Sequence, residues 1–377
     1  MAAVLAGPTQ AAQAASWWLV PAAFTVPSAA DDSGPNDATP VADSLPTRDV
    51  ALPPQPPAAP QAGDPPADPA DTLAPVNSMI PGVLTHEGVL VFEPSIQYLH
   101  ASLNNFVAGC VAILDTVLVG NIQASQTSQD AITGTAGFRY GVTNRLEVEA
   151  RIPYMERSQS TTNTIVSTNT PQSTTDINNS NLGDIEGAVH YQVNDGAQDW
   201  PIFVANLRIK SNSGRGPFDV SRDANGIETQ LPTGSGFWAF EPSVTLVAPS
   251  DPAVFYANVG YLYNLPTDEN QMIGTQFLGR VNPGNAVRIG MGMGVALNEK
   301  VSFSLGYQHD FIAETTFHFS NGQFTSPSLS VGTLNIGVNW QMDQNTALNI
   351  NVAVGVTRDA PDVGLMVRMP ISVKMFD

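Results

Sequence analysis

Apolar and polar residues alternate one by one along much of the chain after about residue 88. Between residues 301 and 311 one set of alternate positions is Val301, Phe303, Leu305, Tyr307, His309 and Phe311, and the other is Ser302, Ser304, Gly306, Gln308 and Asp310. A strict period of two predicts a β-strand, because successive side chains of a strand point to opposite faces. Strands of ten or more residues exceed the usual five or six and match the length that crosses a bilayer at a tilt.

Stretches of this kind recur along the chain and predict about twelve long strands. They are residues 88–102, 130–140, 145–158, 182–194, 200–212, 234–248, 253–266, 285–297, 300–317, 328–341, 346–357 and 362–375. Single-chain bacterial barrels close with an even number of strands. Residues 103–129 include an apolar stretch from Phe106 to Val119 that forms a loop, an inward plug or a further hairpin. The hairpin would raise the count to fourteen, and we favour twelve.

The predicted connections alternate between short turns and long polar loops. Short turns are predicted at 141–144, 194–199, 248–252, 297–300 and 341–346, and long loops at about 157–181, 212–234 and 266–284. Short turns at one end and long loops at the other are typical of outer-membrane barrels. The sequence therefore predicts an all-β fold, a transmembrane antiparallel β-barrel that begins near residue 83 and ends at 377.

Two segments of different character precede the predicted barrel. Residues 1–30 are rich in alanine and contain an apolar run from Trp17 to Val26, which predicts a signal peptide. Residues 31–82 are rich in Pro, Ala and Asp, and proline cannot donate to a sheet ladder. We expect this segment to be a disordered acidic linker, serving as a spacer, a partner-binding arm, part of a gate or a leader that only adds solubility.

Composition supports the barrel and excludes some partners. Only 13% of the residues are charged, against about a quarter in soluble domains, while the mean hydropathy is −0.03. Alternation of apolar with small polar residues produces this balance. The net charge of −19 argues against a nucleic-acid partner, because little in the chain would neutralise phosphates. The single cysteine, Cys110, excludes an internal disulfide and is expected to be a small buried apolar residue.

The inward face of a barrel sets its selectivity, and here it carries both signs of charge. By the alternation, the candidate pore-lining residues are Glu93, Arg139, Glu147, Glu149, Arg151, Glu186, His190, Arg208, Lys210, Glu241, Arg288 and Arg368, with Asn206 beside them. These residues form either a charged constriction that orders solute passage or ion pairs that brace the wall, and we favour the second. Arg139 is expected to approach Glu147 or Glu149 from the adjacent strand.

Nothing in the sequence predicts catalysis. The five histidines show no metal-ligand spacing, and no Gly-x-Ser-x-Gly elbow lies between a strand and a helix. We therefore expect no enzyme, no catalytic residue, no metal and no cofactor. Aromatic residues gather near predicted strand ends, as they do at membrane–water interfaces: Tyr154, Trp200, Phe237, Trp238, Tyr261, Tyr263, Phe317, Trp340 and Phe376.

Several motifs resemble those of the Gram-negative outer-membrane transporter family named for the phenol-degradation meta-pathway. The motifs are residues 91–98 (VFEPSIQY), 114–120 (LDTVLVG), 138–154 (FRYGVTNRLEVEARIPY), 234–238 (GSGFW), 295–299 (VALNE) and 357–362 (TRDAPD). The resemblance covers roughly residues 83–376 and implies a barrel of about twelve strands; the family's name implies an aromatic substrate. A related barrel type secretes functional-amyloid subunits and has an N-terminal extension with a coiled coil and a plug, whereas residues 31–81 here contain no heptads.

These observations predict an outer-membrane channel or transporter that passes small solutes, aromatic or hydrophobic ones among them. The alternative is a secretion conduit for an exported polypeptide such as an amyloid subunit, with the N-terminal segment as docking arm or gate. The expected partners are outer-membrane lipid, the barrel-assembly machinery and the solute. We expect a monomer in the outer membrane with its N-terminal segment in the periplasm.

Overall fold

The computed structural model describes residues 84–108, 112–113, 116–117, 122–165, 173–196, 200–221, 229–250, 253–273 and 276–375. The predicted signal peptide and linker, Cys110 and Phe376 lie outside these residues. Every regular element within them is a β-strand. None of the described residues belongs to a helix long and apolar enough to cross a membrane.

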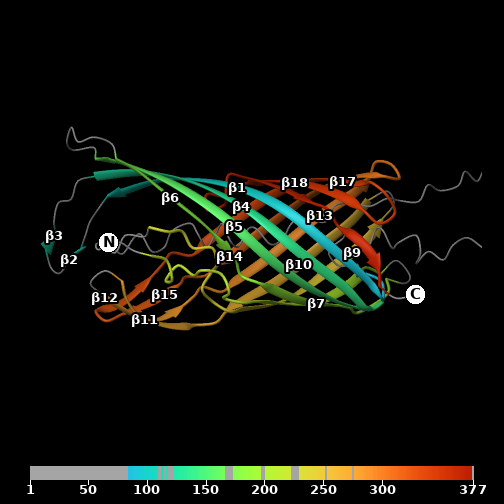
Figure 1. Cartoon of the computed structure of the whole chain (residues 1–377), viewed down its shortest axis with the longest axis horizontal. Helices are drawn as coiled ribbons and strands as arrows, with labels where there is room; N and C mark the ends of the chain where they lie inside the picture. Colours follow the sequence, from blue (N-terminus) through green and yellow to red (C-terminus); the bar gives the residue numbers. More distant parts are fainter. Residues whose placement is uncertain are drawn as a thin grey trace, which may run out of the picture.

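Twelve antiparallel strands form a closed barrel (Figure 1). Its wall consists of β1 (Val89–Ala108), β4 (Ile122–Thr143), β5 (Leu146–Ile165), β7 (Glu186–Gln192), β8 (Ile202–Lys210), β9 (Ala239–Ser250), β10 (Ala253–Asn264), β13 (Ala286–Ala296), β14 (Val301–Ile312), β17 (Leu329–Gln341), β18 (Ala347–Gly355) and β19 (Val363–Arg368). Each pairs with the next, and β19 pairs with β1 to close the ring, with Ser95 opposite Arg368. The predicted twelve-stranded barrel is therefore confirmed.

Two further strands extend the wall without adding positions to the ring. β20 (Ile371–Lys374) follows β19 after Met369 and Pro370 and pairs with the start of β1. β6 (Ser173–Leu182) precedes β7 and pairs with the far half of β5. Proline at position 370 cannot donate a ladder hydrogen bond, which accounts for the break between β19 and β20.

The alternation in the sequence becomes the two faces of the wall. Apolar side chains such as Ile96, Val259 and Leu365 are exposed on the outside, whereas Ser302 and Ser304, which alternate with apolar residues of β14, are fully buried. An apolar exterior over polar side chains is the arrangement that lipid outside and a polar interior require.

Segments that the pattern left unassigned continue the strands. Residues 103–108 extend β1 and 122–129 extend β4, with the two-residue strands β2 (Ala112–Ile113) and β3 (Thr116–Val117) between them, so this region adds no wall strand. The predicted loop at 157–181 is wrong in part, because β5 runs to Ile165 and β6 starts at Ser173. Ser and Thr occupy both faces of this hairpin, so no hydrophobic period marked it, yet Thr suits a strand.

The two ends of the barrel differ, as the connections predicted. At one end, the turn end, strands are joined by residues 144–145, 193–201, 251–252, 297–300 and 342–346. At the other, the loop end, a separate sheet forms from β11 (Thr267–Ile273), β12 (Gln276–Asn282), β15 (Thr316–Phe319) and β16 (Gly322–Thr325) (Figure 1). We call this sheet, together with the described residues of the 211–238 connection, the cap.

An apolar cluster joins the two parts of the cap. Phe218 and Phe237 of the 211–238 connection pack with Leu278 and Val281 of β12 and Phe317 of β15. The interfacial positions expected for Phe237 and Phe317 are therefore wrong: both are buried, because the long loops fold on one another. The other predicted aromatic residues within the described chain are exposed: Trp200, Trp238, Tyr261, Tyr263 and Trp340 lie at or near strand ends, whereas Tyr154 lies in the middle of β5.

Candidate functional site

Charged side chains from nine of the wall strands meet on the inward face of the barrel. We call them the charged belt: Glu93, Arg139, Glu147, Glu149, Arg151, Glu186, His190, Arg208, Glu241, Arg288, Asp310 and Arg368. The structure thus brings together eleven of the twelve candidate residues, and the twelfth, Lys210, lies next to the belt. The strands position these groups, because every second residue of each strand points inward.

Glu93 joins the first and last strands of the ring. Its carboxylate accepts hydrogen bonds from Arg139 Nη2 of β4 at 2.8 Å and from Arg368 Nη1 of β19 at 3.2 Å. Arg139 lies opposite Glu149 on the adjacent strand β5, as expected, and its guanidinium also reaches Glu93 on the other side. One carboxylate between two guanidinium groups stabilises the seam at which the barrel closes.

A second group lies on β5, β7 and β8. Glu149 forms an ion pair with Arg151, and its other oxygen lies 3.0 Å from His190 Nε2. His190 Nδ1 lies 2.8 Å from Asn206 Oδ1, so oxygen acceptors face both ring nitrogens. Both ring nitrogens of His190 therefore have a polar partner within the wall.

Three of these side chains could also bridge a metal ion. Glu147, Glu149 and His190 present ligand atoms within 4.8 Å of one another. Their carboxylates already have partners, because Glu147 accepts a 2.7 Å hydrogen bond from the Thr85 backbone N–H and Glu149 pairs with Arg151. The sequence did not reveal this grouping, since His190 comes from a different strand.

The third group is a row of alternating charges centred on Glu241. Arg208 Nη1 donates to Glu186 at 2.8 Å and Arg208 Nε donates to Glu241 at 3.0 Å. Arg288 Nη1 donates to the same Glu241 oxygen at 3.0 Å, and Arg288 Nε lies 3.4 Å from Asp310. The sequence placed Asp310 on the inward face but did not select it as a site residue.

A glycine allows this row to cross an intervening strand. Glu241 lies on β9 and Arg288 on β13, with Gly260 of β10 between them. A Cβ added at Gly260 would lie 2.9 Å from the Ser243 Cβ and 3.3 Å from Glu241 Oε1. A larger residue at position 260 would therefore crowd the space in which Glu241 lies.

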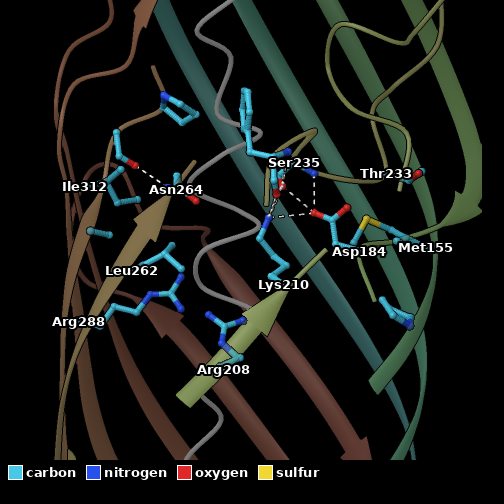
Figure 2. Close-up of a pocket in the computed structure, with 16 residues that line it drawn as sticks. Met155, Asp184, Arg208, Lys210, Thr233, Ser235, Leu262, Asn264, Arg288 and Ile312 are labelled. Atoms are coloured by element: carbon cyan, nitrogen blue, oxygen red, sulfur yellow. Dashed lines mark hydrogen bonds and ion pairs between the residues drawn. The ribbon is translucent and has the colours of Figure 1, made fainter. Parts of the chain in front are cut away.

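A cavity lies between the charged belt and the cap (Figure 2). Arg208, Lys210, Arg288 and Asp184 supply its charged part. Its apolar wall consists of Pro153, Met155, Phe237, Leu262, Pro283, Ala286 and Ile312. Leu262, Ala286 and Ile312 also belong to an apolar cluster at the loop end of the interior, with Ala239 and Val331.

Asp184 fastens the cap to the barrel wall. Its carboxylate accepts hydrogen bonds from the backbone N–H groups of Gly214 at 3.1 Å and Ser235 at 2.8 Å, and from the Ser235 hydroxyl at 2.7 Å. Lys210 Nζ adds an ion pair at 3.0 Å, and Figure 2 shows the contacts of Asp184 with Lys210 and Ser235 beside the cavity. Both ends of the 211–238 connection are thereby held at one carboxylate.

Glycines permit the close approach of the backbone at this point. A Cβ added at Gly234 would collide with Asp184 Oδ1 and lie 2.7 Å from the Gly214 backbone, and one at Gly216 would lie 2.7 Å from the Gly236 Cα. Gly236 has a φ of +79°, a conformation that side chains other than glycine rarely adopt. The segments 214–216 and 234–236 therefore require glycine to pack against each other.

Arg157 holds the same connection from β5. It is almost fully buried, and its Nη1 donates a 2.6 Å hydrogen bond to the Pro232 carbonyl. Asn179 of β6 donates a 2.6 Å hydrogen bond to the neighbouring Leu231 carbonyl. Neither residue was predicted as a site residue: Arg157 stands at the end of the strand predicted at 145–158, and Asn179 lies in the segment predicted to be a loop.

One titratable group of the cap has a shifted pKa. Burial raises the pKa of the Glu269 carboxyl on β11 above its ordinary value, and the nearby charge of Asp219 raises it further. Folding of the cap therefore shifts the equilibrium of Glu269 toward its neutral form relative to an exposed carboxyl group.

A Ser–His contact lies on the outer face of the barrel. His309 Nε2 lies 2.9 Å from Ser330 Oγ and His309 Nδ1 lies 2.7 Å from Tyr307 OH, on neighbouring strands. The His309 ring packs on Phe311, with centroids 4.1 Å apart. These contacts pair the polar atoms of His309 among apolar side chains, as an amphipathic residue near a membrane boundary requires.

Comparison with solved structures gives barrels of low similarity. The translocator domain of the autotransporter NalP from Neisseria meningitidis has 10% identity and a TM-score of 0.40, covering 76% of this chain and 89% of that one. The transport unit of the autotransporter AIDA-I from Escherichia coli has 11% identity and a TM-score of 0.40, covering 81% and 96%. The Pseudomonas putida toluene transporter TodX has 10% identity and a TM-score of 0.35, covering 76% and 89%. Scores this low carry no inference about function.

A family model described as "Putative MetA-pathway of phenol degradation" matches residues 219–366. The matched part runs from the cap into β19 and contains the motifs at 234–238, 295–299 and 357–362. The chain is therefore an outer-membrane-type β-barrel that is similar, over residues 219–366, to the phenol-degradation meta-pathway family.

Proposed function

We propose that this protein is an outer-membrane channel for small solutes, with aromatic or hydrophobic molecules among them. The observation that carries this proposal is the cavity beneath the cap, whose apolar wall from Met155, Phe237, Leu262 and Ile312 lies above the charged belt. Apolar lining with a few placed polar groups is typical of sites that bind small molecules.

The balance of charge in the belt supports passage of solutes over selection of ions. Its six acidic residues face five arginines and His190, and the pairing leaves little net charge on the interior. Channels that select ions by charge use rings of one sign. The twelve candidate residues thus brace the wall and give the pore a polar surface that excludes neither cations nor anions strongly.

The orientation follows from the connections. We place the turn end in the periplasm, with residues 31–82 beside it, and the cap outside the cell. The exposed apolar residues of the wall contact lipid, and the chain acts as a monomer after insertion by the barrel-assembly machinery. Passage then begins at the cap, continues through the cavity and past the charged belt, and ends between the periplasmic turns.

Single-channel conductance in planar bilayers tests the proposal. The full chain without its signal peptide is compared with a version that also lacks residues 31–85. Steady conductance from both supports a channel whose N-terminal segment is dispensable. A channel that opens only on truncation would favour the alternative, a gated conduit for an exported polypeptide. Heat-modifiable gel mobility shows whether each protein is folded. If both are folded and neither conducts, the proposal is contradicted.

A further inference from the structure

Five buried polar side chains on three adjacent strands have atoms without a hydrogen-bond partner. Exposed fractions are at most 7% for all five. The atoms are Oγ of Ser302 and Ser304 on β14, Nδ2 of Asn335 on β17, and both Nδ2 and Oδ1 of Asn349 and Asn351 on β18. We call these five residues the amide strip.

The strip is continuous across the sheet. Gly337 of β17 lies opposite Ser304 of β14 on one side and Asn351 of β18 on the other. A Cβ added at Gly337 would collide with Ser304 Oγ and lie 3.2 Å from Asn351 Nδ2. The side chains of Ser304 and Asn351 therefore come together over the glycine and form one polar surface.

The strip differs from the charged belt in carrying no acid or base. The charged groups of the belt other than Glu147 take part in ion pairs, although single atoms such as Glu186 Oε2 and Glu241 Oε1 have no hydrogen-bond partner, whereas every member of the strip is a neutral amide or hydroxyl. Buried polar atoms in proteins are nearly always hydrogen-bonded, and those that are not call for a water or ligand partner. Seven such atoms in one inward patch indicate a surface that hydrogen-bonds to molecules in the lumen.

The chemistry of the strip restricts its partner. An asparagine amide offers two donors and an acceptor, and a serine hydroxyl both donates and accepts. A hydroxyl-bearing solute matches both capacities. An ion would lose hydration without a counter-charge, and a purely apolar molecule would leave the amides unpaired. Alternate residues of a strand lie roughly 6.7 Å apart and neighbouring strands about 4.8 Å apart, so a molecule of sugar size reaches several members.

We propose that the amide strip binds small uncharged solutes bearing several hydroxyl groups and favours their passage over charged molecules of equal size. This inference rests on the proposed channel function and names a solute class for it. The carbon skeleton of such a solute contacts the apolar wall of the cavity, and its hydroxyl groups then pair with Asn349, Asn351 and Ser304.

The test measures flux of xylose and of the xylonate anion into liposomes that contain the purified full-length protein. The variant carries Asn349→Leu and Asn351→Leu, which keep side-chain size and remove the amides. Xylose flux should fall at least about fivefold while xylonate flux changes less than about twofold, because only the neutral solute uses the amides. Thr245→Val is the matched control, since the Thr245 hydroxyl already accepts hydrogen bonds from Asn206 and Asn258.

A binding measurement keeps the test independent of flux. Xylose should raise the thermal unfolding temperature of the unmodified protein and of the control, but not that of the double variant, because a ligand stabilises the state that binds it. Equal xylose flux in variant and unmodified protein, or an equal shift of unfolding temperature, would show that the strip only holds water and would overturn the inference. Potassium chloride conductance separates the two proposals: if it persists while the xylose effects are absent, only the solute class fails, and if conductance is absent, the channel itself fails.

Discussion

Lys210 Nζ lies 3.0 Å from Asp184 Oδ2 at the point where the cap meets the barrel wall. Both side chains are buried, and the same carboxylate oxygen accepts the backbone and hydroxyl hydrogen bonds of Ser235. The ion pair therefore links the end of β8 to Asp184, and Asp184 in turn holds Ser235 of the 211–238 connection. The cavity depends on this link for its outer wall.

Replacing Asp184 with asparagine should loosen the cap. The substitution leaves Lys210 buried without its counter-charge, and breaking a buried ion pair costs about 3–5 kcal/mol. We expect faster tryptic cleavage after Arg215, measured on the folded protein, together with a higher single-channel conductance. Asp176→Asn on the exposed face of β6 is the control and should change neither. Cleavage rates equal to those of the unmodified protein would show that Asp184 does not hold the cap.

Gly234→Ala should disturb the same contact by sterics alone. The added methyl collides with Asp184 Oδ1 and with the Gly214 backbone, so either the two cap segments separate or the carboxylate moves. Overpacking of this kind costs about 1–3 kcal/mol. The temperature at which the cap unfolds should fall. It is measured as the temperature at which a protease begins to cleave the cap during heating. Gly290→Ala, where no atom lies within 4 Å of the new methyl, should leave it unchanged.

Arg368→Glu should change ion selectivity more than stability. Glu93 retains its hydrogen bond from Arg139, while two carboxylates now adjoin in the lumen. We expect the reversal potential in a potassium chloride gradient to move toward cation preference. Lys300→Glu makes the same charge change in an exposed turn and should have a smaller effect, because solvent screens it. Unchanged reversal potentials in Arg368→Glu would remove this residue from the pore lining.

Glu241→Gln should shift ion selectivity in the direction opposite to that of Arg368→Glu. Glu241 accepts hydrogen bonds from both Arg208 and Arg288. Neutralising it leaves two positively charged guanidinium groups close together with less negative charge between them. We expect a shift toward anion preference and a loss of stability of several kcal/mol, since the residue is buried. A shift toward cations, measured in the same gradient, would contradict the arrangement of this row.

The stability of the cap should depend on pH through Glu269. Its pKa is raised in the folded state, so the stabilising neutral form is present at low pH and is lost as the pH rises above the ordinary carboxyl value of 4.5. Proteolysis of the cap should therefore be slower at mildly acidic than at neutral pH. Glu269→Gln should flatten this dependence, and an unchanged pH profile in that variant would assign the effect to another group.

The sequence by itself determined the barrel, the count of twelve strands and the side of the wall on which each charge lies. These properties depend on a period of two within each strand, which is local and is read from residues such as those between Val301 and Ile312. The placement of the short turns is equally local, since it follows from where the alternation stops.

Only the tertiary structure decided which charges meet and what closes the loop end. Arg139 and Arg368 share Glu93 because the first and last strands are neighbours in the ring, which no local pattern reveals. Asp184, Arg157 and the glycines at 214 and 234 act through contacts between segments far apart in the chain. Such contacts depend on the path of long loops, and the polar composition of those loops does not specify a path, because no hydrophobic period fixes which face is buried.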